Sequence, residues 1–387
     1  MKKFQYLLLS GLVLLSYCGH SQDERRNKEE GGFIFSDIKE QEATEVKNQY
    51  RSGTCWSFGG SSFLESELIR MGKDPVNLSE MFIVRHAYSM KAEEYVRMHG
   101  YFQFGPGGQF HDLIRIIEKN GLVPESAYGG QPIYYGKPVH EEMDAMAKAM
   151  VEVVVKNPNK RLSDHWRSAY EGMLDSYLGE FPEEFEFKGQ SYTPQSYAES
   201  LGVNWGDYVE ITSFSHQPFY ESFVLKIPDN WMLESYYNLP LDDLMEVMKN
   251  AVDQGYTVAW DADVSERTFS FKNGVAFMPD VEYGQMSRER RDTLFNAPGP
   301  ELEVTQENRQ KMYDNYLTTD DHLMHITGSC KDQNGTGYFI VKNSWGDDRN
   351  DCGGYLYASE AYFKAKTVAI LIHKDAIPAK IKKKLGL

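Results

Sequence analysis

The stretch VKNQYRSGTCWSFGGSSF, residues 46–63, places a cysteine between a polar, glycine-containing loop and the start of an apolar helix. Cys55 follows Gln49 by six residues, and apolar residues recur after it at helical spacing, with Gly72 as a stop signal. A thiol attacks as its thiolate, and the N-terminus of a helix stabilises that anion. The stretch therefore predicts a reactive cysteine, which needs a general base from another part of the chain.

The candidate base lies near the other end of the chain. HLMHITGSC and GYFIVKNSW flank the turn KDQNGT and predict a β-hairpin that carries His322 and His325. Residues three apart on a strand face opposite sides, so at most one of these histidines can point into a cleft. The second strand delivers Asn343, whose amide oxygen can orient an imidazole, and Trp345, which can keep water from that bond.

These residues, in this order, resemble the papain-like cysteine peptidases: Gln-x5-Cys-Trp-Ser-Phe, then a distant His, then Asn-Ser-Trp-Gly. That family places the histidine about 130 to 150 residues after the nucleophile, whereas here the separation is 267 residues. The excess is similar to the bleomycin hydrolase and aminopeptidase C group, which carries a long insertion. LSEMFIV, GGQFHDLIRIIEKNGLVPESAY and NLPLDDLMEVMKNAVDQGYTVAWDADV also resemble that group, and the resemblance covers nearly all of residues 33–375.

The resemblance implies a role for each residue of the constellation. Cys55 would be the nucleophile, and His322 the base and then the acid. Asn343 would orient the imidazole, and the Gln49 amide would donate to the oxyanion beside the backbone N–H of Cys55. A cysteine before a helix is more often a buried small hydrophobe, but the four residue types in the expected order favour the catalytic interpretation.

The resemblance also implies substrate contacts. Gly107 and Gly108, in FGPGGQ, match the glycine pair that lines the substrate backbone, and Trp345 completes this set; a glycine-rich turn without a ligand explains the pair equally well. In this group the C-terminal tail commonly enters the cleft and meets the substrate amino group, and members often assemble as hexamers. The tail KIKKKLGL departs from that pattern, and a solvated charged end is the competing interpretation.

The order of elements predicts an α+β fold, since helices come first and antiparallel strands last. We expect a papain-like two-lobed domain over residues 33–375, with a helical N-terminal lobe, an antiparallel β C-terminal lobe and a helical insertion at about 131–205. Residues 22–32, QDERRNKEEGG, predict a flexible lead-in, and residues 376–387 form the C-terminal tail.

The first 21 residues predict a signal peptide, with two lysines before the apolar run YLLLSGLVLL and cleavage after Ser21. We therefore expect an exported protein, periplasmic or extracellular. A retained anchor, or a lipid on Cys18, is the alternative. No later segment is long and apolar enough to predict a membrane helix.

Composition excludes several classes of function. A formal net charge of −16 argues against a general nucleic-acid binder. HEEMD lacks the second histidine of a zinc helix, so no metal or cofactor is expected. Cys330 and Cys352 are interpreted as structural thiols, with a bridge between them left open.

The sequence thus predicts a cysteine-type aminopeptidase that hydrolyses peptides through a thioester. A papain-like endopeptidase with an open cleft and a non-catalytic peptide-binding scaffold of the same fold are the alternatives.

Overall fold

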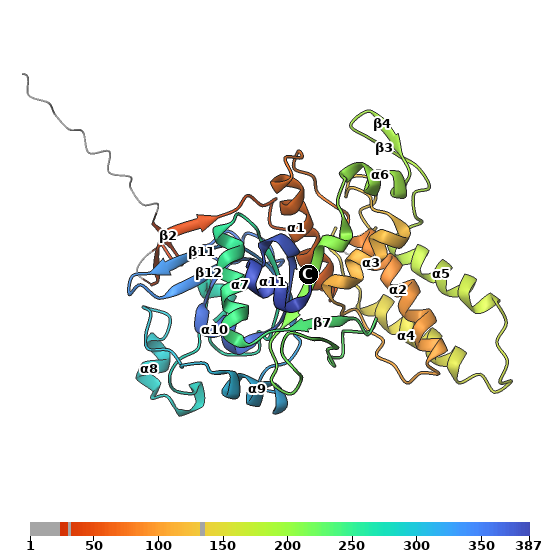
Figure 1. The fold of residues 1–387 in the computed structure, drawn as a ribbon. Helices are drawn as coiled ribbons and strands as arrows, with labels where there is room; N and C mark the ends of the chain where they lie inside the picture. Colours follow the sequence, from red (N-terminus) through yellow and green to blue (C-terminus); the bar gives the residue numbers. More distant parts are fainter. Residues whose placement is uncertain (1–23, 30–31, 132–135) are drawn as a thin grey trace, which may run out of the picture.

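The structure is a computed structural model that describes residues 24–29, 32–131 and 136–387. The predicted signal peptide and Cys18 lie outside the described residues. Helices gather on one side of the molecule and a large sheet on the other, with α1 between them (Figure 1). This arrangement confirms the α+β prediction of a helical N-terminal region followed by a sheet lobe.

Three helices build the helical lobe: α1 (Cys55–Arg70), α2 (Glu80–Arg97) and α3 (Phe110–Asn120). α2 begins where the Ser79 side chain accepts the N–H of Phe82. α3 begins at a reciprocal capping box between Gln109 and Asp112, and its buried face explains the apolar repeat in the sequence.

The segment predicted as an insertion enlarges this lobe. Its elements are α4 (Glu141–Val155), α5 (His165–Leu178), the hairpin β3 (Phe185–Phe187) and β4 (Gln190–Tyr192), and α6 (Pro194–Leu201). Both α4 and α5 pack against α2, where the buried Arg85 pairs with Glu171 and Asp175 at 2.6 Å each. The insertion therefore extends the outer side of the helical lobe (Figure 1).

The sheet lobe contains a twelve-stranded sheet within the described residues. Its strands are β1 (Arg25–Arg26), β2 (Ile34–Glu40), β5 (Tyr208–Thr212), β6 (Ser222–Val224), β7 (Ser235–Asn238), β8 (Val258–Ala262), β9 (Phe269–Ser270), β10 (Val275–Ala276), β11 (His322–Asp332), β12 (Gly337–Lys342), β13 (Tyr355–Ser359) and β14 (Thr367–His373). The strands pair antiparallel, as expected for this lobe, except in two parallel pairs, β5–β7 and β10–β13. Both pairs join strands separated by long connections, which allow a strand to return in the same direction.

The predicted hairpin is confirmed as β11 and β12, which pair antiparallel from His325↔Lys342 to Lys331↔Gly337. Helix α1 packs on one face of this part of the sheet, where Phe63 and Leu323 share a buried cluster. α7 (Leu241–Asp253) and α10 (Glu360–Lys366) cover the opposite face. The short helices α8 (Arg288–Thr293) and α9 (Gln306–Asp314) lie in the long connection to β11.

Part of the expected flexible lead-in is a strand. Arg25 and Arg26 form β1 and pair with Phe35 and Ile34 of β2, and the Asn27 side chain is fully buried. Asn27 donates to the Asn273 carbonyl and accepts the N–H of Phe33. These bonds hold the segment in place, although its charged composition predicts disorder.

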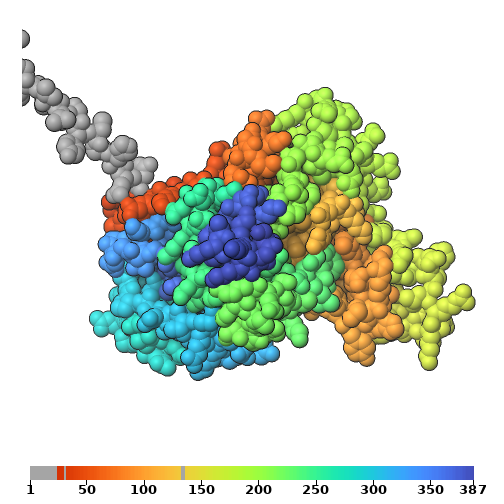
Figure 2. All heavy atoms as spheres, in the orientation of Figure 1, coloured from red at the N-terminus to blue at the C-terminus, as the bar shows by residue number. Residues whose placement is uncertain are grey.

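The C-terminal tail folds as α11 (Ala379–Leu385) and lies beside α7 on the surface of the sheet lobe (Figures 1 and 2). Ile381 and Leu385 join the buried cluster of α7, on the opposite face of the sheet from α1. Lys384 contacts Tyr220 and Asp243. The tail therefore packs away from Cys55, and neither the tail in the cleft implied by the resemblance nor a loose solvated end describes it.

We expect deletion of residues 384–387 to lower stability and leave substrate choice unchanged. The deletion exposes the site of Leu385, whose burial contributes about 2 kcal/mol. Thermal unfolding measures the loss, and the ratio of rates on N-blocked and free peptide substrates measures the choice. A gain of activity on blocked substrates would show that the chain end acts at the cleft.

Candidate active site

Cys55 is the first residue of α1, at the junction of the two lobes. Its preceding residue, Thr54, makes no side-chain cap; its carbonyl accepts the N–H groups of Ser57 and Phe58, and it takes neither the Cys55 nor the Trp56 N–H. The helix crosses β11 so closely that a Cβ added to Gly59 would lie 3.0 Å from the Leu323 carbonyl oxygen. This contact brings the first two turns of α1, which begin at Cys55, against the strand residue that follows His322.

His322 is held by its neighbours on the sheet. Its Nε2 lies 2.8 Å from Oδ1 of Asn343, and the Trp345 ring stacks on the imidazole with centroids 4.6 Å apart. An amide oxygen only accepts, so Nε2 carries the proton and Nδ1 is the free basic nitrogen of the neutral ring. His322 and Asn343 are almost fully buried, so the pair is shielded from water. His325 instead bonds Ser62 of α1 through Nδ1 at 2.9 Å, away from this pair.

Gln49 is tied to the same region through Ser344. The Ser344 hydroxyl donates to Oε1 of Gln49 at 2.6 Å, and the Gln49 N–H donates to the Ser344 carbonyl at 2.8 Å. Because the Ser344 hydroxyl bonds the side-chain oxygen of Gln49, the NH2 group is the end of the amide that remains for a ligand. The structure thus connects Gln49 and Asn343 through adjacent residues of one segment.

Burial favours the neutral forms of the thiol and the imidazole. It raises the pKa of Cys55 to about 12, although the Leu323 backbone bond acts in the opposite direction. Burial likewise lowers the pKa of His322 to about 4, and the bond to Asn343 opposes this change. Burial thus favours a neutral thiol and a neutral imidazole, the forms from which a proton would pass from sulfur to Nδ1.

The two glycines lie beside groups of the protein itself. A Cβ at Gly108 would lie 2.5 Å from a carboxylate oxygen of Asp112 and 2.9 Å from the Trp56 ring. A Cβ at Gly107 would overlap the Asp229 carboxylate. The predicted glycine pair therefore allows close packing of α1 and of the loop that carries Asp229.

Sequence reasoning missed three aspartates near the thiol. After burial, the largest influences that raise the pKa of Cys55 are the charges of Asp320, Asp229 and Asp261. Asp320 precedes His322 by two residues, and Asp261 interrupts the apolar strand VAWDA. An acidic residue inside a buried strand was the available signal, because buried charges are rare unless paired.

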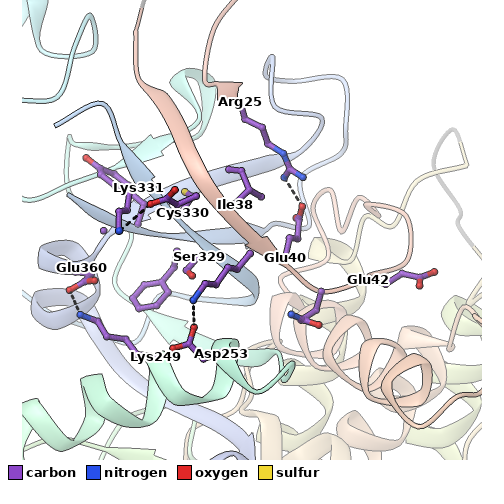
Figure 3. A pocket seen from close by; sticks show the side chains of 16 residues that line it. Arg25, Ile38, Glu40, Glu42, Lys249, Asp253, Ser329, Cys330, Lys331 and Glu360 are labelled. Carbon is purple, nitrogen blue, oxygen red and sulfur yellow. Dashed lines mark hydrogen bonds and ion pairs between the residues drawn. The ribbon is translucent and has the colours of Figure 1, made fainter. Parts of the chain in front are cut away.

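A broad hollow on another part of the surface does not have the features of a reaction site. It lies between β2, β11 and α7, and Figure 3 shows its charged side chains joined in pairs such as Arg25–Glu40 and Lys249–Glu360. Cys330 on its wall is buried, which raises the pKa of the thiol well above its usual range. Cys330 and Cys352 are both free, so the open question of a bridge is answered in favour of two thiols.

Comparisons with known proteins place most of the chain in one family. The model of the Peptidase C1-like family matches residues 81–386, a range that contains His322 and Asn343 and begins after Cys55. Aminopeptidase C of Streptococcus thermophilus is 24% identical over 93% of this chain and 86% of its own length. Bleomycin hydrolase of Mus musculus is 22% identical over 90% of this chain and 84% of its own.

The fold has a counterpart among solved structures. The crystal structure of PepW from Lactobacillus rhamnosis superposes with a TM-score of 0.69 and 20% sequence identity, covering 93% of this chain and 85% of that one. Across the parts of the chain that the structure describes, no helix combines the length and apolar character needed to span a bilayer.

Proposed function

Because the chain belongs to the Peptidase C1-like family, we propose that it is a cysteine-type aminopeptidase with Cys55 as nucleophile. The observation that carries the proposal is the position of His322, whose Nε2 is fixed by Asn343 while α1, which begins at Cys55, contacts the adjacent Leu323 backbone. This leaves Nδ1 to exchange a proton with the sulfur. Several relatives that cover most of the chain are aminopeptidases by name.

The reaction follows from these positions. Nδ1 of His322 accepts the thiol proton, and the Cys55 sulfur attacks the carbonyl carbon of the first peptide bond. The backbone N–H of Cys55 and the NH2 group of Gln49 stabilise the oxyanion. His322 then donates its proton to the leaving amine, which yields a thioester. Water attacks the thioester with His322 again as base, and the first residue is released.

The action on N-termini has structural support in the loop between β6 and β7. This loop, residues 225–234, carries Asp229 against Gly107 and Trp231 against Asp112. Family resemblance assigns the glycine pair to the substrate backbone, so the loop covers the side of the cleft that residues before the cleaved bond would occupy. A peptide with a short N-terminal part fits this arrangement best.

The experiment compares a free aminoacyl fluorogenic substrate with its N-blocked counterpart and measures labelling of Cys55 by a thiol-directed epoxide. We expect labelling, and at least about tenfold higher kcat/KM on the free substrate, since a buried charged contact contributes about that factor. Equal or better cleavage of the blocked substrate would establish an endopeptidase instead. Absence of both labelling and turnover in the folded, reduced protein would establish a scaffold without activity.

A further inference from the structure

Three carboxylates from three separate segments converge near the Cys55 thiol. Asp261 pairs in register with Leu323 across β8 and β11, and residues directly opposite in a sheet project to the same face. That face carries α1, because Leu323 belongs to the buried cluster of that helix. Asp320 lies just before β11, and Asp229 lies over Gly107. The charges of all three act on the thiol.

These carboxylates lack the partners that buried charges normally have. Asp261 is fully buried beside Asp320 and the Gln109 amide, yet neither of its oxygens has a hydrogen bond of normal length and angle. Asp320 accepts from the Gln109 amide at 3.1 Å, and its other neighbours are the Asp261 carboxyl and the Asp229 backbone. Within the described residues, no lysine, arginine or histidine forms an ion pair with Asp229, Asp261 or Asp320.

The buried cation in this region, Lys91, is already engaged. Its ammonium donates to the carbonyl oxygens of Gly105 and Gly107, and its charge acts on Asp112 and Asp229. The largest influences on Asp261 and Asp320 are burial and neighbouring carboxylates, which raise the pKa of both, that of Asp320 to about 8. A raised pKa holds a carboxyl group in its neutral form, and a bound cation would favour the ionised form and lower that pKa.

We propose that Asp229, Asp261 and Asp320 form a subsite for a primary ammonium group of the substrate. Resting on the proposed function, we assign this group to the free N-terminus of the residue whose carbonyl carbon Cys55 attacks. A lysine side chain is the other source of the same chemistry. The subsite would supply a negative charge that binds the amino group. The resemblance assigns this contact to the C-terminal tail, which in this chain packs on α7.

Binding of an ammonium group would also change the ionisation of Cys55. A bound ammonium offsets the carboxylates that oppose formation of the thiolate, so recognition of a free N-terminus also favours ionisation of Cys55. A blocked peptide brings no such charge to the site.

The first test uses Asp320→Asn and Asp261→Asn, with Asp332→Asn as the matched control. Asp332 is likewise an aspartate with one buried, unpartnered oxygen, but it lies at the end of β11 beside the hairpin turn. We expect each site variant to lose about tenfold in kcat/KM on free aminoacyl substrates and to keep its rate on blocked ones, because hydrogen bonds to a charged group contribute about that factor. Unfolding temperatures should change little, since an asparagine amide matches the size of the neutral carboxyl group that it replaces. Equal losses on both substrates would overturn the proposal.

The second test is independent of turnover. It compares the rates at which Cys55 reacts with cationic aminoethyl methanethiosulfonate and with neutral methyl methanethiosulfonate, each normalised to free cysteine. We expect a preference of about tenfold for the cationic reagent in the wild-type protein, lost in Asp320→Asn. A persistent preference without peptidase activity would refute only the proposed function, whereas an active enzyme without the preference would refute the subsite.

A third test uses two reporters to distinguish the two sources of the ammonium group. An N-blocked lysyl reporter and an N-blocked leucyl reporter are compared in the wild type and in Asp261→Asn. Equal behaviour of the two reporters supports the N-terminus as the ligand. A loss confined to the lysyl reporter assigns the site to the side chain.

Discussion

Replacing Cys55 by alanine is expected to abolish turnover of aminoacyl substrates, with a loss of about 10⁴-fold or more, because the reaction loses the atom that forms the thioester. Cys55 is the first residue of α1 and 9% exposed. An alanine there keeps the helix start and removes only the sulfur, so the fold should persist. Rates on a free aminoacyl reporter, beside a circular dichroism spectrum, measure the two effects.

Cys352→Ala is the matched control for this variant. Cys352 is free and partly buried, and its sulfur lies near Gly274 and the Asn27 carbonyl. We expect Cys352→Ala to keep both its full rate and its labelling by the epoxide, whereas Cys55→Ala loses both. Retention of turnover in Cys55→Ala would refute the assigned nucleophile, and loss of turnover in Cys352→Ala would show that general damage to the fold can mimic the result.

The residues of the proposed reaction were predictable because each belongs to a short motif. Cys55 follows Gln49 closely, and Asn343 precedes Trp345, so local sequence carries both groups. The hairpin turn then predicts that His322 and Asn343 meet, and the structure places them 2.8 Å apart. What the sequence did not supply is the depth of burial that makes both the thiol and the imidazole neutral.

The acidic subsite could not be predicted in the same way. Its three residues lie far apart in the chain: Asp229 in the loop between β6 and β7, Asp261 in β8 and Asp320 just before β11. Their proximity depends on the register of β8 against β11 and on the course of the loop over Gly107. No spacing rule along the chain encodes these relations, because sheet order is set by long-range packing.

The tail illustrates the opposite error, in which composition suggests too little structure. KIKKK reads as a charged, solvated end, yet Ile381 and Leu385 are spaced by four residues and face the same side of a helix. The lysines on the other side meet acids of α7, as Lys384 meets Asp243 and Lys380 meets Glu246. Apolar spacing, more than net charge, was the informative feature of this segment.

The contact between α1 and β11 controls the geometry of the proposed reaction, because one element carries the thiol and the other carries the imidazole. Gly59 lies at this contact, and a Cβ there would lie 3.0 Å from the Leu323 carbonyl oxygen and 3.3 Å from the Met324 nitrogen. Backbone atoms of a central strand cannot rotate away as a side chain can. Any larger residue must therefore move the helix relative to the strand.

We expect Gly59→Val to lower kcat/KM by about 100-fold, because a displacement of about 1 Å between reacting groups has an effect of that size. Gly59→Ala should lie between this variant and the wild type. Gly60→Ala is the matched control, since its Cβ would meet the side chains of Leu113 and Phe110, which can adjust. Kinetics on a free aminoacyl substrate, with circular dichroism to verify folding, measure the series. A folded Gly59→Val enzyme with an unchanged kcat/KM would show that the helix can move without separating sulfur from imidazole, and the close contact of α1 with β11 would then have no part in positioning the nucleophile.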